Sequence, residues 1–312
     1  MNRSYSFRVP ASTSNLGAGF DALSLALQRY LRISLTIEPS PGRKPSEVLR
    51  IDVRGVDAHL IPASSENLIL RVASNVARER KKELPGFRMA IDNEIPLARG
   101  MGSSAAAIIA GITCYELAAE DKLSDQQIFR YAFEFEPHPD NLAAALRGGL
   151  VATAVTAGGE VLIAKLAVAG GILPVLVIPA FELSTEKARA VLPQMYSRPD
   201  AVYNIQRSAL TIAALTSGNW PMLGEAMRDR IHQPYRARLI PGLEEILGLT
   251  TPGLIAVALS GAGPTVLGFA RPEDAETAGR AIAGVFEKHG VQATPVVVNI
   301  DTVGRFMEGS SS

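Results

Sequence analysis

The sequence predicts an α+β protein of two domains, in which helices cover β-sheets. Its 312 residues are long enough for two ordinary domains, although length alone would also permit one large domain. Strand-like and helix-like segments alternate along the chain without a repeat of fixed period, and such alternation favours α/β or α+β layers. Hydrophobic residues make up 47% of the chain and charged residues 20%, which is the balance of a well-packed globular protein.

In the first half of the chain, local composition predicts both strands and helices. Apolar residues at helical spacing, including Leu68, Val72 and Val76, indicate one helix. A second helix is alanine-rich and begins with two serines, and a third is capped by Ser124 or Asp125. The expected strands span residues 6–9, 31–37, 48–53 and 87–91, the helices span 67–80, 103–119 and 125–135, and a turn or loop spans 39–42.

Glycine pairs separate this half from the second. One pair, Gly148 and Gly149, precedes two expected strands at 150–155 and 161–168, and another pair follows them. We therefore place a domain boundary near residue 168, which gives domains 1–168 and 169–312. Beyond it we expect strands at 173–178, 254–259, 265–270 and 294–300, a helix beginning at Thr185, helices within 201–226 and a helix over 272–289.

Composition excludes several classes of protein. Lysine plus arginine equals aspartate plus glutamate, at 31 each, so no global positive field attracts nucleic acid or an acidic membrane. Cys114 is the single cysteine, which excludes a disulfide framework or a cysteine-based metal cluster. The N-terminus lacks an apolar targeting segment, and no apolar run reaches membrane-spanning length. We expect a cytoplasmic protein without nucleic-acid or membrane partners.

The segment 95–107 has two glycines, then two serines that open an alanine-rich helix. Gly100 and Gly102 let the backbone bend and approach a ligand closely. The first amide groups of the helix have no partners within it, and together with the helix dipole they suit a phosphate. Ser103 and Ser104 add hydroxyls, one of which could ligate Mg²⁺. No lysine follows the glycines, so this is not a Walker A loop, and a serine-capped structural helix is the alternative interpretation.

Two further glycine-bearing segments lie on either side of it in the chain. Residues 9–21 follow a strand and place Asn15 and Asp21 in a glycine-rich turn. Residues 259–265 read Leu-Ser-Gly-Ala-Gly-Pro-Thr between two apolar strands, where a hairpin connection is expected. Taken alone, either segment could be only a tight connection.

In their order, the three segments resemble the three motifs of the GHMP kinases, named for galactokinase, homoserine kinase, mevalonate kinase and phosphomevalonate kinase. The resemblance spans the chain from Pro10 to Thr265. It implies an N-terminal domain like ribosomal protein S5 domain 2, a ferredoxin-like C-terminal domain and an active site between them. It also implies that ATP is bound by Pro96, Leu97, Ala98, Arg99, Gly100, Met101, Gly102, Ser103, Ser104, Ala105 and Ala106, together with Gly261 and Gly263.

Residues 136–141 are similar to a segment of the homoserine kinase branch of this family. They read Glu-Pro-His-Pro-Asp-Asn and lead into a small-residue stretch that ends in two glycines. The resemblance implies a substrate-pocket role for His138, Asp140 and Asn141. It also implies that Ser104 and Glu136 hold Mg²⁺, with Glu134 as the alternative ligand.

Two arginine segments resemble substrate-binding segments of the same branch. Thr185 and Arg189 are four residues apart, which puts them on one face of a helix, and Arg236 lies in the run His-Gln-Pro-Tyr-Arg. Arginine forks suit the carboxylate of a free amino acid, while Asp21 or Asp140 can accept its ammonium group. The first motif contains no lysine, which disfavours mevalonate as the substrate.

The resemblance therefore implies in-line phosphoryl transfer from MgATP to the hydroxyl of L-homoserine, in which positioning and charge stabilisation suffice without a strong base. Asn15 and Asn141 would orient the hydroxyl, Arg236 would hold the carboxylate, and Arg189 would hold it too or contact the γ-phosphate. The family also implies a homodimer. Two alternatives stay open: a GHMP kinase for another alcohol such as mevalonate or a sugar, and a GHMP-fold ligand-binding protein without catalysis.

Overall fold

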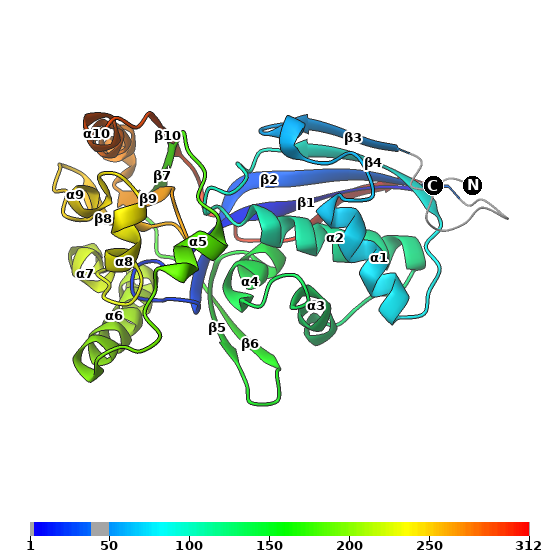
Figure 1. Cartoon of the computed structure of the whole chain (residues 1–312), viewed down its shortest axis with the longest axis horizontal. Helices are drawn as coiled ribbons and strands as arrows, with labels where there is room; N and C mark the ends of the chain where they lie inside the picture. Colours follow the sequence, from blue (N-terminus) through cyan, green and yellow to red (C-terminus); the bar gives the residue numbers. More distant parts are fainter. Residues whose placement is uncertain (1–2, 39–49, 312) are drawn as a thin grey trace.

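The computed structural model describes residues 3–38 and 50–311, and Figure 1 shows two β-sheets side by side with helices packed against them. The turn or loop expected at 39–42 and the first two residues of the strand expected at 48–53 lie outside the described residues.

The first sheet contains seven strands in the described part of the chain. Its centre is the antiparallel pair β1 (Arg3–Ser14) and β2 (Leu23–Glu38), both longer than predicted because their buried residues continue beyond the segments of strand-like composition. Their register shifts between Pro10 and Ala11, where proline cannot donate a ladder hydrogen bond. The order is β11-β1-β2-β4-β3, with β5 beside β2 and β6 beside β5; the other bounds are β3 (Arg50–Gly55), β4 (Gly86–Asn93), β5 (Leu150–Val155), β6 (Val161–Leu166) and β11 (Phe306–Ser311).

Four α-helices lie together on one side of this sheet (Figure 1): α1 (Leu68–Glu79), α2 (Ser103–Ala119), α3 (Asp125–Ala132) and α4 (Pro139–Arg147). The bounds predicted for α2 are confirmed, and the helix is largely buried between α1 and β1. α3 begins at a capping box of Ser124 and Gln127 and ends at Ala132, three residues before the predicted end. α4 was not predicted; Pro139 stands in its first turn, where a missing N–H costs nothing.

The second sheet is antiparallel, with the order β10-β7-β9-β8. Its strands are β7 (Leu173–Pro179), β8 (Leu254–Leu259), β9 (Val266–Ala270) and β10 (Ala293–Val297). The long helix α10 (Ala275–Lys288) covers it with Ala278, Ile282 and Phe286. The other α-helices are α5 (Thr185–Ala190), α6 (Arg198–Ser217), α7 (Trp220–Ala226), α8 (Gln233–Arg236) and α9 (Leu243–Leu247), and short 3₁₀ turns span Ala58–Leu60, Ala237–Leu239 and Pro272–Asp274.

The last strand, β11, returns the chain to the first sheet. It was not predicted, and it pairs with β1 while Glu308 contacts Arg8 and Arg32. The division of the chain at residue 168 falls between β6 and β7, but it stays a prediction, because residues beyond it contribute to both sheets. Within the described residues, no helix combines the length and the apolarity needed to cross a membrane.

Candidate active site

A cavity of about 340 Å³ lies where the two sheets meet. Its walls come from the loop after β1, the loop before α2, the start of α4, the segment around α5, α8 and the β8–β9 turn. Most of the predicted site residues line it: Asn15, Asp21, Ala98, Gly100, Met101, Gly102, Ser103, Ser104, Ala105, Glu136, His138, Asp140, Asn141, Thr185, Arg189, Arg236 and Gly261.

The three glycine-bearing segments converge on this cavity through direct hydrogen bonds. The buried hydroxyl of Ser260 lies 2.6 Å from the Gly100 carbonyl oxygen and 2.8 Å from the Thr13 hydroxyl, so one side chain joins all three segments. The Ser12 amide also donates to the Met101 carbonyl at 3.1 Å. The loop before α2 is therefore fixed by its two partner segments rather than by its own turn alone.

Both glycines of this loop are required by close packing. Gly100 and Gly102 have φ angles of 75° and 69°, in the left-handed region that favours glycine. A Cβ on Gly100 would lie 2.3 Å from the Ser260 carbonyl oxygen, and one on Gly102 would lie 2.1 Å from the Ser12 hydroxyl. The missing side chains therefore make room for the neighbouring segments, a role that the sequence interpretation did not anticipate.

The beginning of α2 faces the cavity. Gly102 is its N-cap and offers no side chain to accept from the first amide groups, while Ser103, Ser104 and Ala105 line the cavity. Open amide groups and the positive end of the helix dipole suit an anion.

Five predicted ATP-binding residues are not brought to the cavity wall: Pro96, Leu97, Arg99, Ala106 and Gly263. Arg99 turns away, because its guanidinium donates to the Pro179 carbonyl at the end of β7. The space beside Gly263 is filled by Ile240 and Leu259 instead of a ligand. Leu97 lines a different cavity, described below.

The segment 136–141 brings polar groups to the cavity from the start of α4. The Asn141 carboxamide accepts from the Ser12 hydroxyl at 2.7 Å and donates to the Ser14 hydroxyl at 2.9 Å. The His138 ring contacts the Glu136 carboxylate, and the His138 amide donates to the same oxygen at 3.2 Å. These contacts tie the segment to the first motif and fix its orientation.

Asp140 is a buried carboxylate, only 2% exposed. Burial raises its pKa to about 6; the Asn141 backbone amide, which donates at 2.7 Å, opposes the shift, and the charge of Asp21 adds to it. A buried carboxyl beside a second carboxylate is a charge arrangement typical of functional sites.

Asp21, in the loop between β1 and β2, contacts Arg189 on helix α5. Their side chains form a bidentate ion pair, with Nη2 2.6 Å from Oδ1 and Nη1 3.1 Å from Oδ2. Arg189 shares one face of α5 with Thr185, as predicted, and both line the cavity. The pair therefore provides one anionic and one cationic group at the same wall.

Arg236 is a guanidinium that is 1% exposed, yet it lines the cavity. Its Nε donates to the Ala188 carbonyl at 3.1 Å, and its Nη1 donates to the Gly261 carbonyl at 3.0 Å and lies 3.2 Å from His232 Nδ1. Burial and the nearby charge of Arg189 lower its pKa to about 10, so it stays cationic at neutral pH. These contacts use Nε and Nη1 and leave Nη2 for a ligand.

The side chain of Asn15 is occupied by backbone groups. Its oxygen accepts from the Asp21 amide at 3.0 Å, and its nitrogen donates to the Gly261 carbonyl at 2.9 Å. Asn15 lines the cavity, but this geometry favours a role in holding Asp21 and the β8–β9 turn together over direct contact with a substrate hydroxyl.

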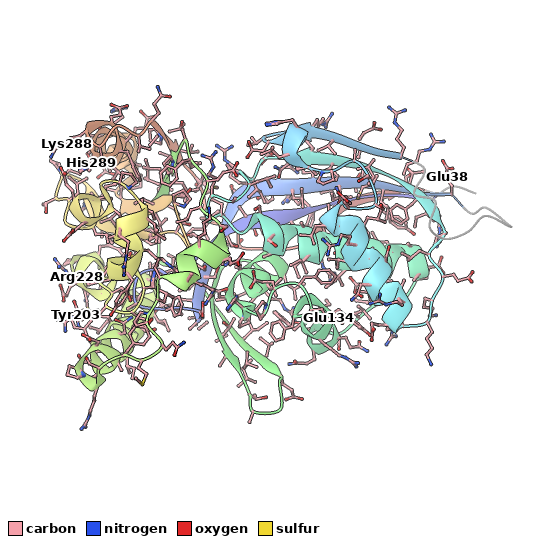
Figure 2. All side chains as sticks on the ribbon, viewed as in Figure 1. Glu38, Glu134, Tyr203, Arg228, Lys288 and His289 are labelled. Carbon is pink, nitrogen blue, oxygen red and sulfur yellow. The ribbon has the colours of Figure 1, made fainter. Side chains whose placement is uncertain are left out.

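The two glutamates considered as metal ligands lie in different places. Glu136 lines the cavity with Ser104, whereas the carboxylate of Glu134, labelled in Figure 2, accepts from Asn75 at 2.7 Å and lies outside that wall. Within the described residues, no group of three or more His, Cys, Asp or Glu side chains could hold a metal ion by itself. One carboxylate and one hydroxyl still form an oxygen donor set of the kind Mg²⁺ uses together with substrate phosphates.

A second cavity of about 240 Å³ shares Ser103 and Ser104 with the first. It is mostly apolar, and sequence reasoning missed it, because the part of its wall outside the segment 95–107 comes from separate segments that carry no motif. They include the 3₁₀ turn, the start of α1 and two strands: Leu31, Leu60, Ile61, Pro62, Asn67, Leu68, Ile69, Ile91, Asn93, Leu97 and Ala107. Four residues that line the first cavity were not predicted: Ser14, Leu183, Ser184 and Ala262. Of these, Ser14 stands within the first motif.

Comparison with known proteins agrees with this architecture. The models of the GHMP kinase N-terminal and C-terminal domains match residues 67–149 and 211–288. A homoserine kinase of Solibacter usitatus is 46% identical over 86% of each chain, and one of Desulfitobacterium hafniense is 38% identical over 95% of this chain and 97% of its own.

Solved structures share the fold. A homoserine kinase from Cytophaga hutchinsonii superposes with a TM-score of 0.81 at 24% identity over 97% of each chain. The mevalonate kinase of L. major, solved with R-mevalonate, superposes with a TM-score of 0.68 at 17% identity over 96% of each chain. The predicted two-domain α+β fold is thus confirmed, and the chain belongs to the GHMP kinase family, in its homoserine kinase branch.

Proposed function

We propose that the protein transfers the γ-phosphoryl group of MgATP to the hydroxyl of L-homoserine and forms O-phospho-L-homoserine, a step of threonine biosynthesis. One observation carries the proposal: a single cavity joins the anion-binding start of α2 to Asp21, Arg189 and Arg236. The first suits a phosphate chain, and the second group suits the carboxylate and ammonium of an amino acid. The homoserine kinases among the relatives support this choice of acceptor.

The phosphates of ATP would lie against the loop 98–105. Backbone amides at the start of α2 would donate to the phosphate oxygens without reorganising, because the loop is already fixed by Ser12 and Ser260. The nucleoside end would occupy the apolar 240 Å³ cavity, since Ser103 and Ser104 line both spaces and join them at the phosphate loop.

Ser104 and Glu136 would hold the Mg²⁺ that accompanies ATP. Magnesium commonly takes one or two protein oxygens and completes its shell with phosphates and water. When bound, it neutralises the charge that develops on the transferring phosphoryl group. The contact of His138 with Glu136 holds the carboxylate toward the cavity side of α4.

Homoserine would be held through both of its charges. Its carboxylate suits Nη2 of Arg236, with Arg189 as a second cation, and its ammonium group suits Asp21 or Asp140. Mevalonate also has a carboxylate but lacks the ammonium group, so it would leave these acidic side chains without a ligand cation. The wall therefore favours an amino acid over a plain hydroxy acid.

The hydroxyl would lie near Asn141, between the acceptor wall and the phosphate loop. Ser12 and Ser14 hold the Asn141 side chain in place, and the second lone pair of its oxygen would accept from the nucleophile with little loss of freedom on binding. Phosphoryl transfer has a loose transition state, in which positioning and charge stabilisation dominate. Asn15 would act indirectly, because its side chain holds Asp21 and Gly261 in place without contacting the hydroxyl.

The test is a panel of acceptors with MgATP, scored by ADP release and by mass spectrometry of the product. We expect turnover on L-homoserine and none on mevalonate or galactose. Turnover on mevalonate without homoserine would identify a different GHMP kinase, and MgATP binding without transfer to any acceptor would identify a non-catalytic protein. Homodimerisation and a cytoplasmic location stay predictions.

A further inference from the structure

We infer that His232 is a positioning residue for the acceptor, which holds Arg236 in the orientation that receives the substrate carboxylate. The inference rests on the proposed function and adds to it a residue to which the sequence pattern assigned no role. It follows from the contacts of one buried imidazole ring.

The partners of the two ring nitrogens of His232 determine which nitrogen donates a hydrogen bond and which accepts one. The side chain is 0% exposed; Nε2 lies 2.8 Å from the Gly17 carbonyl oxygen and Nδ1 lies 3.2 Å from Nη1 of Arg236. A carbonyl oxygen can only accept and a guanidinium can only donate. The ring is therefore neutral, with its proton on Nε2 and its lone pair on Nδ1 directed at Arg236.

The surroundings keep the ring in this state. Burial lowers the pKa of His232, and the charge of Arg236 lowers it further, while Asp229 and Asp21 act in the opposite direction. Asp229 does not form a hydrogen bond with the ring, because its carboxylate lies 3.6 Å from Nε2. Instead it accepts hydrogen bonds from the backbone amides of Ile231, His232 and Gln233. A protonated ring would direct an N–H at the guanidinium and displace it.

The orientation of the ring is also fixed from the first sheet. Phe20 stacks on His232 with the ring centroids 5.2 Å apart, and the same Phe20 ring lies 5.5 Å from Cζ of Arg236 and 5.3 Å from Cζ of Arg189. Gly17, which accepts from the imidazole, has a φ of 76°, and a Cβ there would meet the Met227 carbonyl oxygen at 1.9 Å. The loop 17–20 therefore packs closely against the segment that precedes α8.

Arg236 needs such support because its own helix is short. α8 spans only Gln233–Arg236, and the guanidinium is held by two carbonyl oxygens, of Ala188 and Gly261, besides His232. Nη1 donates to both the Gly261 oxygen and His232 Nδ1, which sets the plane of the guanidinium and leaves Nη2 outside these contacts. Loss of the Nδ1 acceptor would let the plane rotate and would weaken bidentate recognition of a carboxylate.

Two substitutions separate the two contacts of the ring. His232→Gln places an amide donor near the position of Nε2, so it can keep Gly17 but lacks an acceptor for Arg236. His232→Asn places an oxygen near the position of Nδ1, so it can keep Arg236 and loses Gly17. The matched control is His289→Gln, at the exposed end of α10, where the ring contacts Glu245 (Figure 2).

The measurement is KM for homoserine, KM for ATP and kcat of each variant, at a temperature below the lowest melting temperature in the set. We expect His232→Gln to raise KM for homoserine about tenfold, the scale of one hydrogen bond to a charged group, and to leave KM for ATP within about twofold. His232→Asn should raise KM for homoserine by less than about threefold, although it loses the buried contact to Gly17. His289→Gln should match the wild type.

A double-mutant cycle with Arg236→Lys decides whether His232 acts through Arg236. In the Arg236→Lys background, we expect His232→Gln to lower kcat/KM by less than about twofold, since the contact between His232 and Arg236 is already lost. Two outcomes would overturn the inference and leave His232 as a purely structural residue. One is a roughly tenfold loss of kcat/KM from His232→Gln in the Arg236→Lys background, and the other is an equal rise in KM for homoserine in His232→Gln and His232→Asn. A wild-type protein that does not phosphorylate homoserine would instead refute the proposed function.

Discussion

The two ends of the active-site cavity are built differently. The proposed phosphate end, at residues 98–105, consists of backbone held by Ser12 and Ser260, whereas the proposed acceptor end consists of the charged side chains of Asp21, Arg189, Arg236 and Asp140. Backbone amides attract any phosphate, so the first end suits a nucleotide shared by many kinases. The second end matches two opposite charges at fixed places and therefore selects the acceptor.

The largest effect should come from breaking the acceptor end. Arg189→Ala removes a cation from the wall and leaves Asp21 without its bidentate partner. We expect kcat/KM for homoserine to fall at least about 10²-fold, with KM for ATP nearly unchanged. Steady-state kinetics measures both constants.

The control for that variant is Arg228→Ala. Arg228 is an exposed arginine whose ion pair with Glu225 lies away from the cavity, and Figure 2 labels it. It should retain wild-type kinetics. Near-wild-type turnover by Arg189→Ala would remove Arg189 from the site.

The matching change at the phosphate end is Gly100→Ala. The new Cβ would meet the Ser260 carbonyl oxygen at 2.3 Å, and that backbone atom cannot move without disturbing the β8–β9 turn. Gly159→Ala is the control, because Gly159 has a similar φ of 81° and no atom within 4 Å of the added Cβ. We expect Gly100→Ala to lower the free energy of unfolding by about 2 kcal/mol more than the control and to raise KM for ATP. Equal melting curves for the two variants would contradict this prediction, because they would show that the loop shifts to accommodate the added Cβ.

The proposed metal ligands, Ser104 and Glu136, line the same cavity. Glu136→Gln should raise the Mg²⁺ concentration for half-maximal activity about tenfold, since it removes the charge of the carboxylate in the cavity. Glu134→Gln, whose native carboxylate contacts Asn75, should leave the Mg²⁺ dependence as in the wild type. A shift in the Glu134 variant alone would reverse the assignment.

The smallest expected effect is a gain in stability. The pKa of Asp140 is raised from 3.8 to about 6, so its ionised form destabilises the fold; this penalty is absent below pH 3.8, grows up to about pH 6 and is complete above it. Asp140→Asn should therefore be more stable than the wild type by an amount that grows through this window, and it should lose activity. Thermal melts across the window measure the gain, and a gain that shrinks with rising pH would contradict the raised pKa.

The sequence predicted the phosphate end better than its surroundings. Ser103 was placed correctly at the start of α2, because two glycines, two serines and an alanine-rich run are local signals. The orientation of Arg99 depends on Pro179, and the raised pKa of Asp140 depends on its burial and on the charge of Asp21, which is distant in the chain. Such features follow from tertiary packing, which no local pattern records.

The same reason explains what was missed. α4 starts at Pro139 directly after a charged segment, so helix periodicity has too few residues to show it. His232 stands in a quoted run, but its role needs Gly17 and Arg236 on either side of the ring. The apolar cavity near Leu60 is assembled from five separate stretches of chain.

The return of β11 to the first sheet has a consequence for how the chain folds. β1 pairs with residues about 300 positions away, at Ser4–Ser311 and Arg8–Phe306, and Tyr30 donates to Asp301 at 2.9 Å. Contacts of such long range form late and slow folding, because the loop must close before they stabilise anything. During synthesis the edge of β1 should stay open until residues 306–311 emerge, so we expect the second sheet to be formed before the first is complete.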